Sequence, residues 1–348
     1  MENEHLPSVV IVIPHCNGKE ILLRCLESLQ NDGYDGKRVL LVDNASTDDS
    51  VIESRKAYPW LEVLSLPQNL GFSGGVNAGI RHAEADIIVL LNNDTVVSPG
   101  WLQPLVDALE SNDHVAAVQP KLRSWFDKEL FDYAGGAGGE IDRWGYPFCW
   151  GRIFTTREPD NGQYSQARSI FWASGSASAW RRSAIMDAGL LDEDFFAHME
   201  EIDLCWRLHM MGYDVRYQPG PEVYHCSGGT LSEEKLRKKF LNHRNSWIIL
   251  IKNYRWGNVL KTVPLRLLLD LITIPYALVF WGDIKRVLAI VGSWFSVLFG
   301  LPRWLRSRKI VQQLRTVPDE IVLRRIYARS VAWQYFFRKI KFAKELPW

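Results

Sequence analysis

Two short acidic segments, far apart in the chain, carry residue types that could do chemistry. The first, LLNNDT, ends an apolar, strand-like run and contains Asp94. The second, EEIDLCWR, contains Glu200, Glu201 and Asp203, and an isolated histidine, His225, follows it. Open α/β sheets bind ligands at the carboxyl ends of their strands. A carboxylate there can hold a divalent cation that in turn holds a diphosphate, and the second segment can supply a general base.

Strand-like and helical patterns alternate over the first third of the chain, which predicts a doubly wound, mostly parallel sheet. The expected strands are residues 9–13, 38–42, 61–66 and 86–91, and the expected helices are residues 19–30, 48–58, 74–83 and 101–111. From residue 115 to 166 the pattern loosens into glycine, proline and aromatic residues. Regular structure is expected again as helices over 182–188 and 203–211 and a short strand over 215–217.

Four motifs in fixed order carry a resemblance to a known family. They are VDNASTD from residue 42, NLGFSGGVNAG from residue 69, NND from residue 92 and EEID from residue 200. This order resembles the family 2 glycosyltransferases, and within them the bacterial rhamnosyltransferase-like branch, over residues 8–245. The resemblance implies a GT-A type fold and an inverting transferase that uses a nucleotide-sugar donor. It further implies dTDP-rhamnose as donor and a lipid-linked or growing polysaccharide acceptor for cell-surface glycan synthesis.

Residues at the strand ends and in the glycine-rich turn are expected to bind the nucleotide-sugar. Glycines let a backbone approach a ligand closely, and the helix start beyond them can face phosphate. Asp43 ends a strand and could instead cap the next helix. No lysine follows the turn as in a P-loop. The residues assigned to the donor are Pro14, Asp43, Asn44, Asn69, Gly71, Gly74, Asn77, Asn92 and Asn93.

The resemblance implies a Mg²⁺ or Mn²⁺ site made of Asp94 and His225. Asparagine stands where the family pattern Asp-x-Asp has its first acid, which removes one negative charge from the site.

The family position of the catalytic base is held here by Glu201, one methylene longer than the usual aspartate. Glu200 is the alternative base, and Asp203 is grouped with them or caps the following helix. Trp172 and Gly175 are assigned to the acceptor.

The net charge of +1 hides a strong asymmetry. Residues 1–234 contain 18 basic and 35 acidic side chains, a balance of −17, whereas residues 235–348 contain 23 and 5, a balance of +18. The basic part also holds seven tryptophans and long apolar runs. This combination favours an anionic membrane surface over nucleic acid. The apolar run over residues 263–281 is interrupted by prolines and charged residues. The run over residues 287–301 is shorter than the ~20 residues that a transmembrane helix needs. We therefore expect amphipathic helices, with a packed helical subdomain as the alternative.

These features predict a catalytic domain over residues 1–240 and a helical, membrane-associating region over 241–348. The five scattered cysteines indicate a reducing compartment without disulfides or a zinc site. The first residues do not resemble a signal peptide. The expected location is cytoplasmic, peripheral on the inner face of the cell membrane, and a homo-oligomer is left open.

Three other functions deserve comparison. A UDP-sugar donor, such as UDP-galactofuranose or UDP-N-acetylglucosamine, would use the same fold. A sugar-nucleotide pyrophosphorylase would need a basic, glycine-rich loop after the first strand, and PHCNG at residue 14 lacks it. A non-catalytic scaffold derived from a transferase would be expected to have lost Asp94 or the acidic cluster, and both are present.

Overall fold

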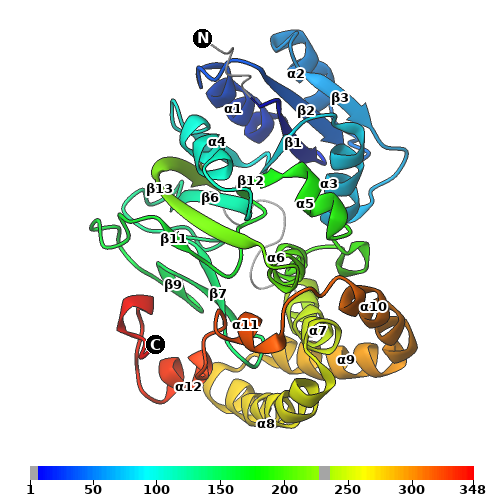
Figure 1. Cartoon of the computed structure of the whole chain (residues 1–348), viewed down its shortest axis with the longest axis vertical. Coiled ribbons are helices and arrows are strands. Elements are labelled where there is room, and N and C mark those ends of the chain that lie inside the picture. Colours follow the sequence, from blue (N-terminus) through cyan, green and yellow to red (C-terminus); the bar gives the residue numbers. More distant parts are fainter. Residues whose placement is uncertain (1–6, 227–235) are drawn as a thin grey trace.

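A computed structural model describes residues 7–226 and 236–348. Within these residues a nine-stranded sheet has the order β11-β13-β6-β12-β4-β1-β2-β3, with β5 paired to β13 (Figure 1). Its strands are β1 (Val9–His15), β2 (Lys37–Asp43), β3 (Glu62–Ser65), β4 (Ile87–Leu91), β5 (Thr95–Val97), β6 (Val115–Ser124), β11 (Arg168–Ser169), β12 (Ala177–Arg181) and β13 (Asp214–His225).

The first half of this sheet confirms the doubly wound prediction. β1 pairs in parallel with β2 and β4, and β2 with β3. Alternate residues of β1 enter two separate cores: α1 (Lys19–Gln30) and α4 (Gln103–Glu110) pack on one face of the sheet, and α3 (Gly71–His82) packs on the other. The remaining helix of this half is α2 (Ser50–Ala57). Helices on both faces explain why these strands read as continuous apolar runs.

The second half differs from the sequence prediction. β6 lies where no strand was expected, and the short strand expected at 215–217 is the twelve-residue β13, which runs parallel to β6. The pairing register shifts between Gln218 and Glu222, and the intervening residues include two prolines, which disrupt a ladder because they lack an N–H. The residues expected to be loose form a second sheet in the order β10-β9-β8-β7. Its strands are β7 (Gly139–Ile141), β8 (Pro147–Cys149), β9 (Arg152–Ile153) and β10 (Thr156–Arg157).

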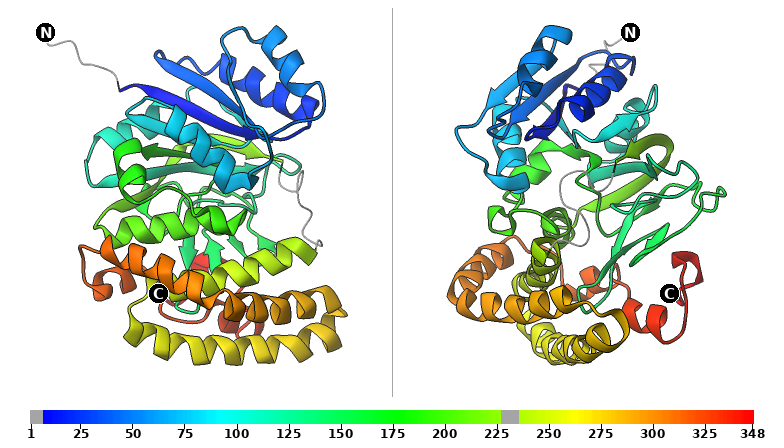
Figure 2. Two further views of the ribbon diagram at one scale, coloured as in Figure 1. Left: turned by 90° about the vertical axis from the view of Figure 1, so that its right-hand side faces the viewer. Right: turned by 180° about the vertical axis from the view of Figure 1, so that it is seen from behind.

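Helices after β12 complete the fold, and those from α7 onward gather at the end of the molecule farthest from α2 (Figures 1 and 2). The predicted boundary at residue 240 divides a continuous helix, because α7 already begins at Leu236. The helices are α5 (Arg182–Asp187), α6 (Glu200–Met210), α7 (Leu236–Asn253), α8 (Trp256–Trp281), α9 (Ile284–Phe299), α10 (Leu301–Gln313), α11 (Asp319–Leu323) and α12 (Val331–Phe336), with the 3₁₀ turns η1 (Glu193–Phe195) and η2 (Ala343–Glu345).

α8 is one continuous helix of 26 residues, although Pro264 and Pro275 lie inside it. In the part of the chain that the structure describes, it alone has the length and apolar composition of a membrane span, and α9 with α10 would qualify as a pair bent by 72°. One face of α8 is polar and packed: Arg266 and Asp270 form a fully buried ion pair of 3.2 Å. α8 is therefore amphipathic, with an apolar outer face.

Candidate active site

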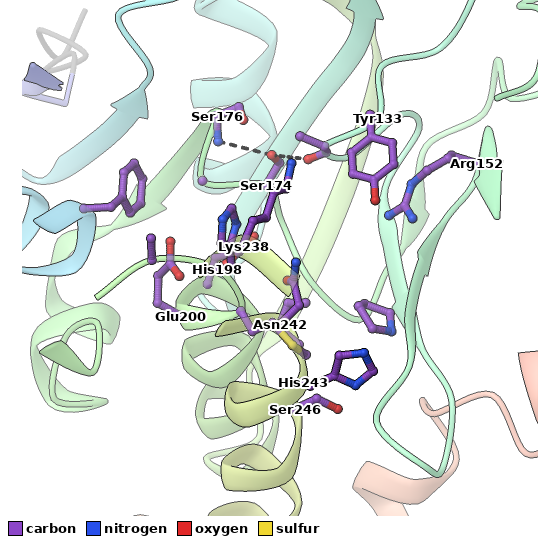
Figure 3. A pocket seen from close by; sticks show the side chains of 18 of the residues that line it. Tyr133, Arg152, Ser174, Ser176, His198, Glu200, Lys238, Asn242, His243 and Ser246 are labelled. Atoms are coloured by element: carbon purple, nitrogen blue, oxygen red, sulfur yellow. Dashed lines mark hydrogen bonds between the residues drawn. The ribbon is translucent and has the colours of Figure 1, made fainter. Parts of the chain in front are cut away.

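One large cavity brings most of the predicted site together. It has a volume of about 1230 Å³ and lies at the carboxyl ends of β1, β2 and β4, between the sheet, the second sheet and α7 (Figure 3). Twelve residues singled out from the sequence line it: Pro14, Asn44, Asn69, Gly71, Asn92, Asn93, Asp94, Trp172, Gly175, Glu200, Glu201 and His225.

Four singled-out residues do not line this cavity. Asp43 accepts a hydrogen bond from Ser46 N (2.8 Å), so its carboxylate shapes the turn after β2. A Cβ on Gly74 would lie 2.6 Å from the Leu70 Cβ, so close packing explains this glycine. Asn77 donates to the Leu191 carbonyl at 2.8 Å and braces the segment that leads to α6. These three residues support the site without facing it.

Asp203 is the fourth. Its carboxylate is fully buried in the first turn of α6 and is contacted by Arg207 Nε (3.0 Å), Lys252 Nζ (3.1 Å) and Asn253 Nδ2 (3.0 Å). Burial alone would raise the pKa of Asp203, but these cations lower it, so the group stays ionised. Because α6 begins three residues earlier, Asp203 is not a helix cap. Its role is to join α6 to α7.

Backbone pairing places the two expected metal ligands side by side. His225 lies opposite Thr95 in the β13–β5 ladder, directly beside Asp94. The side chains of His225 and Asp94 therefore meet, with His225 Nε2 3.1 Å from Asp94 Oδ1. On its other side, His225 Nδ1 donates to Asp132 Oδ1 at 2.9 Å. The contact with Asp132 turns Nε2 toward the buried Asp94 Oδ1, so the imidazole lies between two carboxylates.

A divalent cation that replaced the proton on Nε2 would lie between this nitrogen and the Asp94 carboxylate. Burial opposes a positive charge on His225, but the carboxylates of Asp132 and Asp94 outweigh it and raise its pKa well above the usual value. A carboxylate behind a histidine ligand is a common support of metal sites. In residues 7–226 and 236–348 no third His, Cys, Asp or Glu completes a protein-only site. The pair therefore fits an ion that takes its other ligands from phosphate or water.

Glu200 and Glu201 start α6 and share an environment poor in water. Figure 3 shows Glu200 in the cavity wall. The Oε2 atoms of both glutamates are buried without a hydrogen-bond partner in the described part of the chain. Burial raises the pKa of Glu201 to about 7, and burial together with the charge of Glu201 raises the pKa of Glu200 well above its usual value. A carboxylate whose pKa lies near neutral pH is suited to accept a proton.

The turn before this pair has an unusual backbone. Phe196, His198 and Met199 have φ values of 63°, 69° and 70°, the left-handed region that non-glycine residues rarely adopt. Asn245 of α7 holds the turn, because its Nδ2 lies 3.3, 3.1 and 2.7 Å from the carbonyl oxygens of Phe195, Ala197 and His198. The middle of α7 thus supports the turn that precedes the glutamate pair.

A family model for glycosyl transferase family 2 matches residues 10–185, half of the chain. The chain belongs to glycosyltransferase family 2. The resemblance noted in the motifs is thereby confirmed, and the match ends before α6, so the glutamate pair lies beyond it.

Several curated relatives of this family 2 protein are bacterial enzymes. It is 29% identical over 231 residues to N-acetylglucosaminyl-diphospho-decaprenol L-rhamnosyltransferase of Mycobacterium tuberculosis, covering 61% of this chain and 74% of that protein. It is 29% identical over 238 residues to pre-mycofactocin glycosyltransferase of the same species, covering 67% and 45%. Poly-beta-1,6-N-acetyl-D-glucosamine synthase of Staphylococcus epidermidis is 23% identical over 223 residues, covering 63% and 50%. The chain spans about half the length of the latter two.

Solved structures confirm the GT-A fold prediction. The crystal structure of GalNAc-T7 with UDP, GalNAc and Mn²⁺ has a TM-score of 0.54 at 18% identity and covers 64% of this chain and 44% of that one. The mannosyltransferase PcManGT from Pyrobaculum calidifontis, in complex with GDP-Man and Mn²⁺, has a TM-score of 0.52 at 14% identity and covers 97% and 89%. At these identities the likeness shows the fold.

Sequence reasoning missed several cavity residues of this family 2 chain. His15 accepts from Asn93 Nδ2 (2.8 Å) and bonds Ser50 Oγ (2.8 Å), and its place directly after Pro14 at a strand end could have revealed it. Tyr133, Arg152 and Lys238 come from loops and elements that share no motif with the strand ends. Figure 3 shows Tyr133 and Arg152 on one side of the cavity, and Lys238 Nζ lies 5.4 Å from the Tyr133 ring centroid.

Proposed function

We propose that this family 2 transferase is inverting and divalent-metal-dependent, and that it moves rhamnose from dTDP-rhamnose to a lipid-linked or polysaccharide acceptor. The observation that carries the proposal is that the glycine-rich turn, the Asp94–His225 pair and the Glu200–Glu201 pair line one cavity. The name of the rhamnosyltransferase relative supports the donor sugar and the acceptor class. Mn²⁺ and a nucleotide or nucleotide-sugar in two fold neighbours support the metal and the donor.

The proposed reaction is one displacement. The acceptor hydroxyl oxygen forms a bond to the anomeric carbon while the bond from that carbon to the diphosphate oxygen breaks. Glu201 takes the hydroxyl proton, and the nucleoside diphosphate leaves with the electron pair of the broken bond. Attack opposite the leaving group inverts the anomeric centre. Glu200 keeps its proton throughout, and the clamped turn before α6 fixes where both carboxyl groups point.

Asp94 and His225 would hold the Mg²⁺ or Mn²⁺ ion, and Asp132 would orient the imidazole. When bound, such an ion supplies neutralising charge for a leaving diphosphate. Asn92 and Asn93 line the cavity beside Asp94 without adding negative charge. His15 holds Asn93 in place through the hydrogen bond to its Nδ2.

A panel of nucleotide-sugars tests this function. A ligand that binds the folded chain raises its melting temperature. We expect dTDP-rhamnose with Mn²⁺ to raise it most, ahead of UDP-galactofuranose, UDP-N-acetylglucosamine and GDP-mannose. A larger increase in melting temperature with a UDP-sugar would show that this sugar nucleotide, and not dTDP-rhamnose, is the donor. No response to any of them, together with no release of nucleoside diphosphate, would favour the non-catalytic scaffold.

The rate of transfer should depend on pH through Glu201. Its burial raises its pKa to about 7, so the fraction in the basic form falls as pH falls below that value. We expect kcat to decrease by about ten-fold per pH unit between pH 6.5 and 5 and to level off above pH 8. Donor binding measured over the same range serves as the control. A flat profile between pH 5.5 and 8 would contradict the role of Glu201.

We also propose that the helical region places the enzyme on the inner face of the cell membrane. The outer faces of α8 and α9 carry large exposed apolar side chains, with exposed fractions of 75% for Val279, 70% for Phe280 and 80% for Phe299. The basic residues of this region add attraction to anionic lipid, worth about 1 kcal/mol for each one close to the surface. The proposed division is a catalytic part and a membrane-associating part that share α7.

Flotation with anionic liposomes tests this location. We expect the full-length protein to float at low salt, to be partly released by high salt and to be fully released only by detergent, because salt screens charge but not apolar insertion. Val279→Asp with Phe299→Asp should abolish flotation at high salt. Ile52→Asp, at an apolar position on α2 that is 59% exposed, is the control. A wild-type protein that stays unbound at low salt would show that this surface serves another purpose.

A further inference from the structure

The cavity has a second end that the transfer chemistry does not use. Its wall continues from the glutamate pair along α7 to a set of apolar residues on α8 and α12. We call this end the apolar limb. It is lined by Ile272, Thr273, Tyr276, Trp281, Trp333 and Phe336.

Aromatic rings build most of the limb. The ring centroid of Tyr276 lies 5.0 Å from that of Trp281 and 6.1 Å from that of Phe336, and Trp281 and Phe336 are 5.5 Å apart. Ile272 and Trp333 remain 47% and 51% exposed, so the limb is open to the surroundings. An apolar channel that connects an active site to the outside exposes surface to water unless something fills it.

The orientation of the limb is set by the buried ion pair of α8. Arg266 Nη1 donates to the Trp144 carbonyl (2.6 Å) and Ser246 Oγ (2.7 Å), and Asp270 accepts from Trp247 Nε1 at 3.0 Å. Removing one member of such a pair leaves a buried charge without its partner, which is strongly unfavourable. The pair therefore fixes which side of α8 faces the cavity and which side faces outward with its apolar residues.

Cationic groups border the same cavity. The guanidinium of Arg286 lies 4.9 Å from the Trp281 ring centroid and is held by Asp283 at 3.1 Å. Arg152 and Lys238 also line the cavity (Figure 3), with Arg152 Cζ 4.5 Å and Lys238 Nζ 5.4 Å from the Tyr133 ring centroid. Carboxyl groups for chemistry, cations for an anion and an aromatic limb thus meet in one space. An acceptor that matches all three carries a hydroxyl, a phosphate group and a long apolar chain.

We propose that the apolar limb is the binding site for the chain of a lipid diphosphate-linked acceptor, with Arg152, Lys238 and Arg286 at its diphosphate. The proposal rests on the proposed function and narrows its acceptor to this class. The chain enters from the membrane side between α8 and α12, and the diphosphate lies inward of it. The sugar beyond the diphosphate reaches Glu201. The acceptor then never leaves the membrane surface during transfer.

Competition binding with farnesyl diphosphate as the probe tests the limb. The full-length protein, free of detergent, is titrated with a fluorescent farnesyl diphosphate analogue, which is displaced by farnesyl diphosphate, inorganic diphosphate, farnesol or a short-chain phosphatidic acid. Burial of even two methylenes favours binding by about ten-fold. We expect farnesyl diphosphate to compete at least about ten-fold better than each of the other three.

Variants locate the site. Thr273→Trp fills the limb from α8 and Ala332→Phe fills it from α12, and each should weaken farnesyl diphosphate at least about ten-fold. Val279→Trp adds the same side chain on the outer face of α8 and should leave the affinity for farnesyl diphosphate unchanged. Arg286→Gln should weaken farnesyl diphosphate binding, whereas Lys285→Gln, at the exposed neighbouring position, should leave it unchanged. Unchanged melting temperatures show that the variants are folded.

Two results would overturn the proposal. Equal competition by farnesol or phosphatidic acid would show adsorption to an apolar surface only, and equal affinities of Thr273→Trp and Val279→Trp would place the chain elsewhere. The donor panel separates this failure from failure of the proposed function. If the protein binds nucleotide-sugars but the limb variants do not affect lipid binding, the proposed function stands and the lipid site is wrong. If it binds the lipid through the limb but binds no nucleotide-sugar, the lipid site stands and the proposed function is wrong.

Discussion

Replacement of Asp94 by asparagine is expected to reduce sugar transfer by on the order of 10³-fold or more, because metal stabilisation of a leaving group is worth several kcal/mol. The change keeps the shape of the side chain and removes the charge that faces His225 Nε2 at 3.1 Å. Because the carboxylate also pairs with His225 of β13, the melting temperature of the metal-free variant is compared with that of the wild type to separate loss of metal from loss of stability. Turnover and the Mn²⁺-induced change in melting temperature measure the effect.

Asp132→Asn is the matched control for the metal site. It leaves both proposed ligands in place but removes the charged acceptor of the His225 Nδ1–H bond. A supporting group of this kind typically changes metal affinity by about 10–100-fold. Mn²⁺ affinity should therefore rank wild type above Asp132→Asn and Asp132→Asn above Asp94→Asn. If Asp94→Asn transfers sugar at the wild-type rate, Asp94 is not a metal ligand.

Glu201→Gln should lower kcat by about 10²–10⁴-fold while donor binding survives, since glutamine keeps the size and loses the basicity. Glu200→Gln should behave differently. Glutamine resembles the protonated Glu200 that we propose, so kcat above pH 8 should change by only a few-fold.

The pair also makes a prediction about the pH profile. Glu200→Gln should leave the pKa of Glu201 raised, because burial is its largest cause and the change replaces one uncharged group, the proposed protonated Glu200, by another. The decrease of kcat at low pH should therefore remain in Glu200→Gln and be absent in Glu201→Gln. A larger loss of kcat in Glu200→Gln than in Glu201→Gln would exchange the two roles. Donor-induced shifts in melting temperature control for folding in both variants.

The sequence predicted the parts of this protein that depend on neighbouring residues. The pattern of apolar residues placed helix α1 at its observed bounds, Lys19–Gln30, and located the parallel strands of the first half. The carboxyl ends of parallel strands meet at one edge, so Pro14, Asn44 and Asp94 could be assigned to one site before any coordinates were known. The order of four motifs was enough for the family.

The hydrogen-bond partners of buried polar groups could not be predicted from neighbouring residues in the sequence. Asp132 supports His225 from 93 residues away, and Asn245 holds the turn before Glu200 from a helix that the sequence placed at the start of another region. Asn77 has a motif position that suggests ligand contact, yet its amide is used to hold Leu191. In each case the partner lies far along the chain, and only packing decides which group it meets.

The sequence by itself determined the fold class, the family, the edge of the sheet that carries the chemistry and the charge asymmetry of the helical region. Periodicity and strand-end chemistry are local, and a few residues suffice to encode them. The tertiary structure decided that α7 lines the cavity, that Asp203 is a buried support, and that the cavity continues into an aromatic limb between α8 and α12. These depend on which distant surfaces exclude water together, and that is a property of the packed chain as a whole.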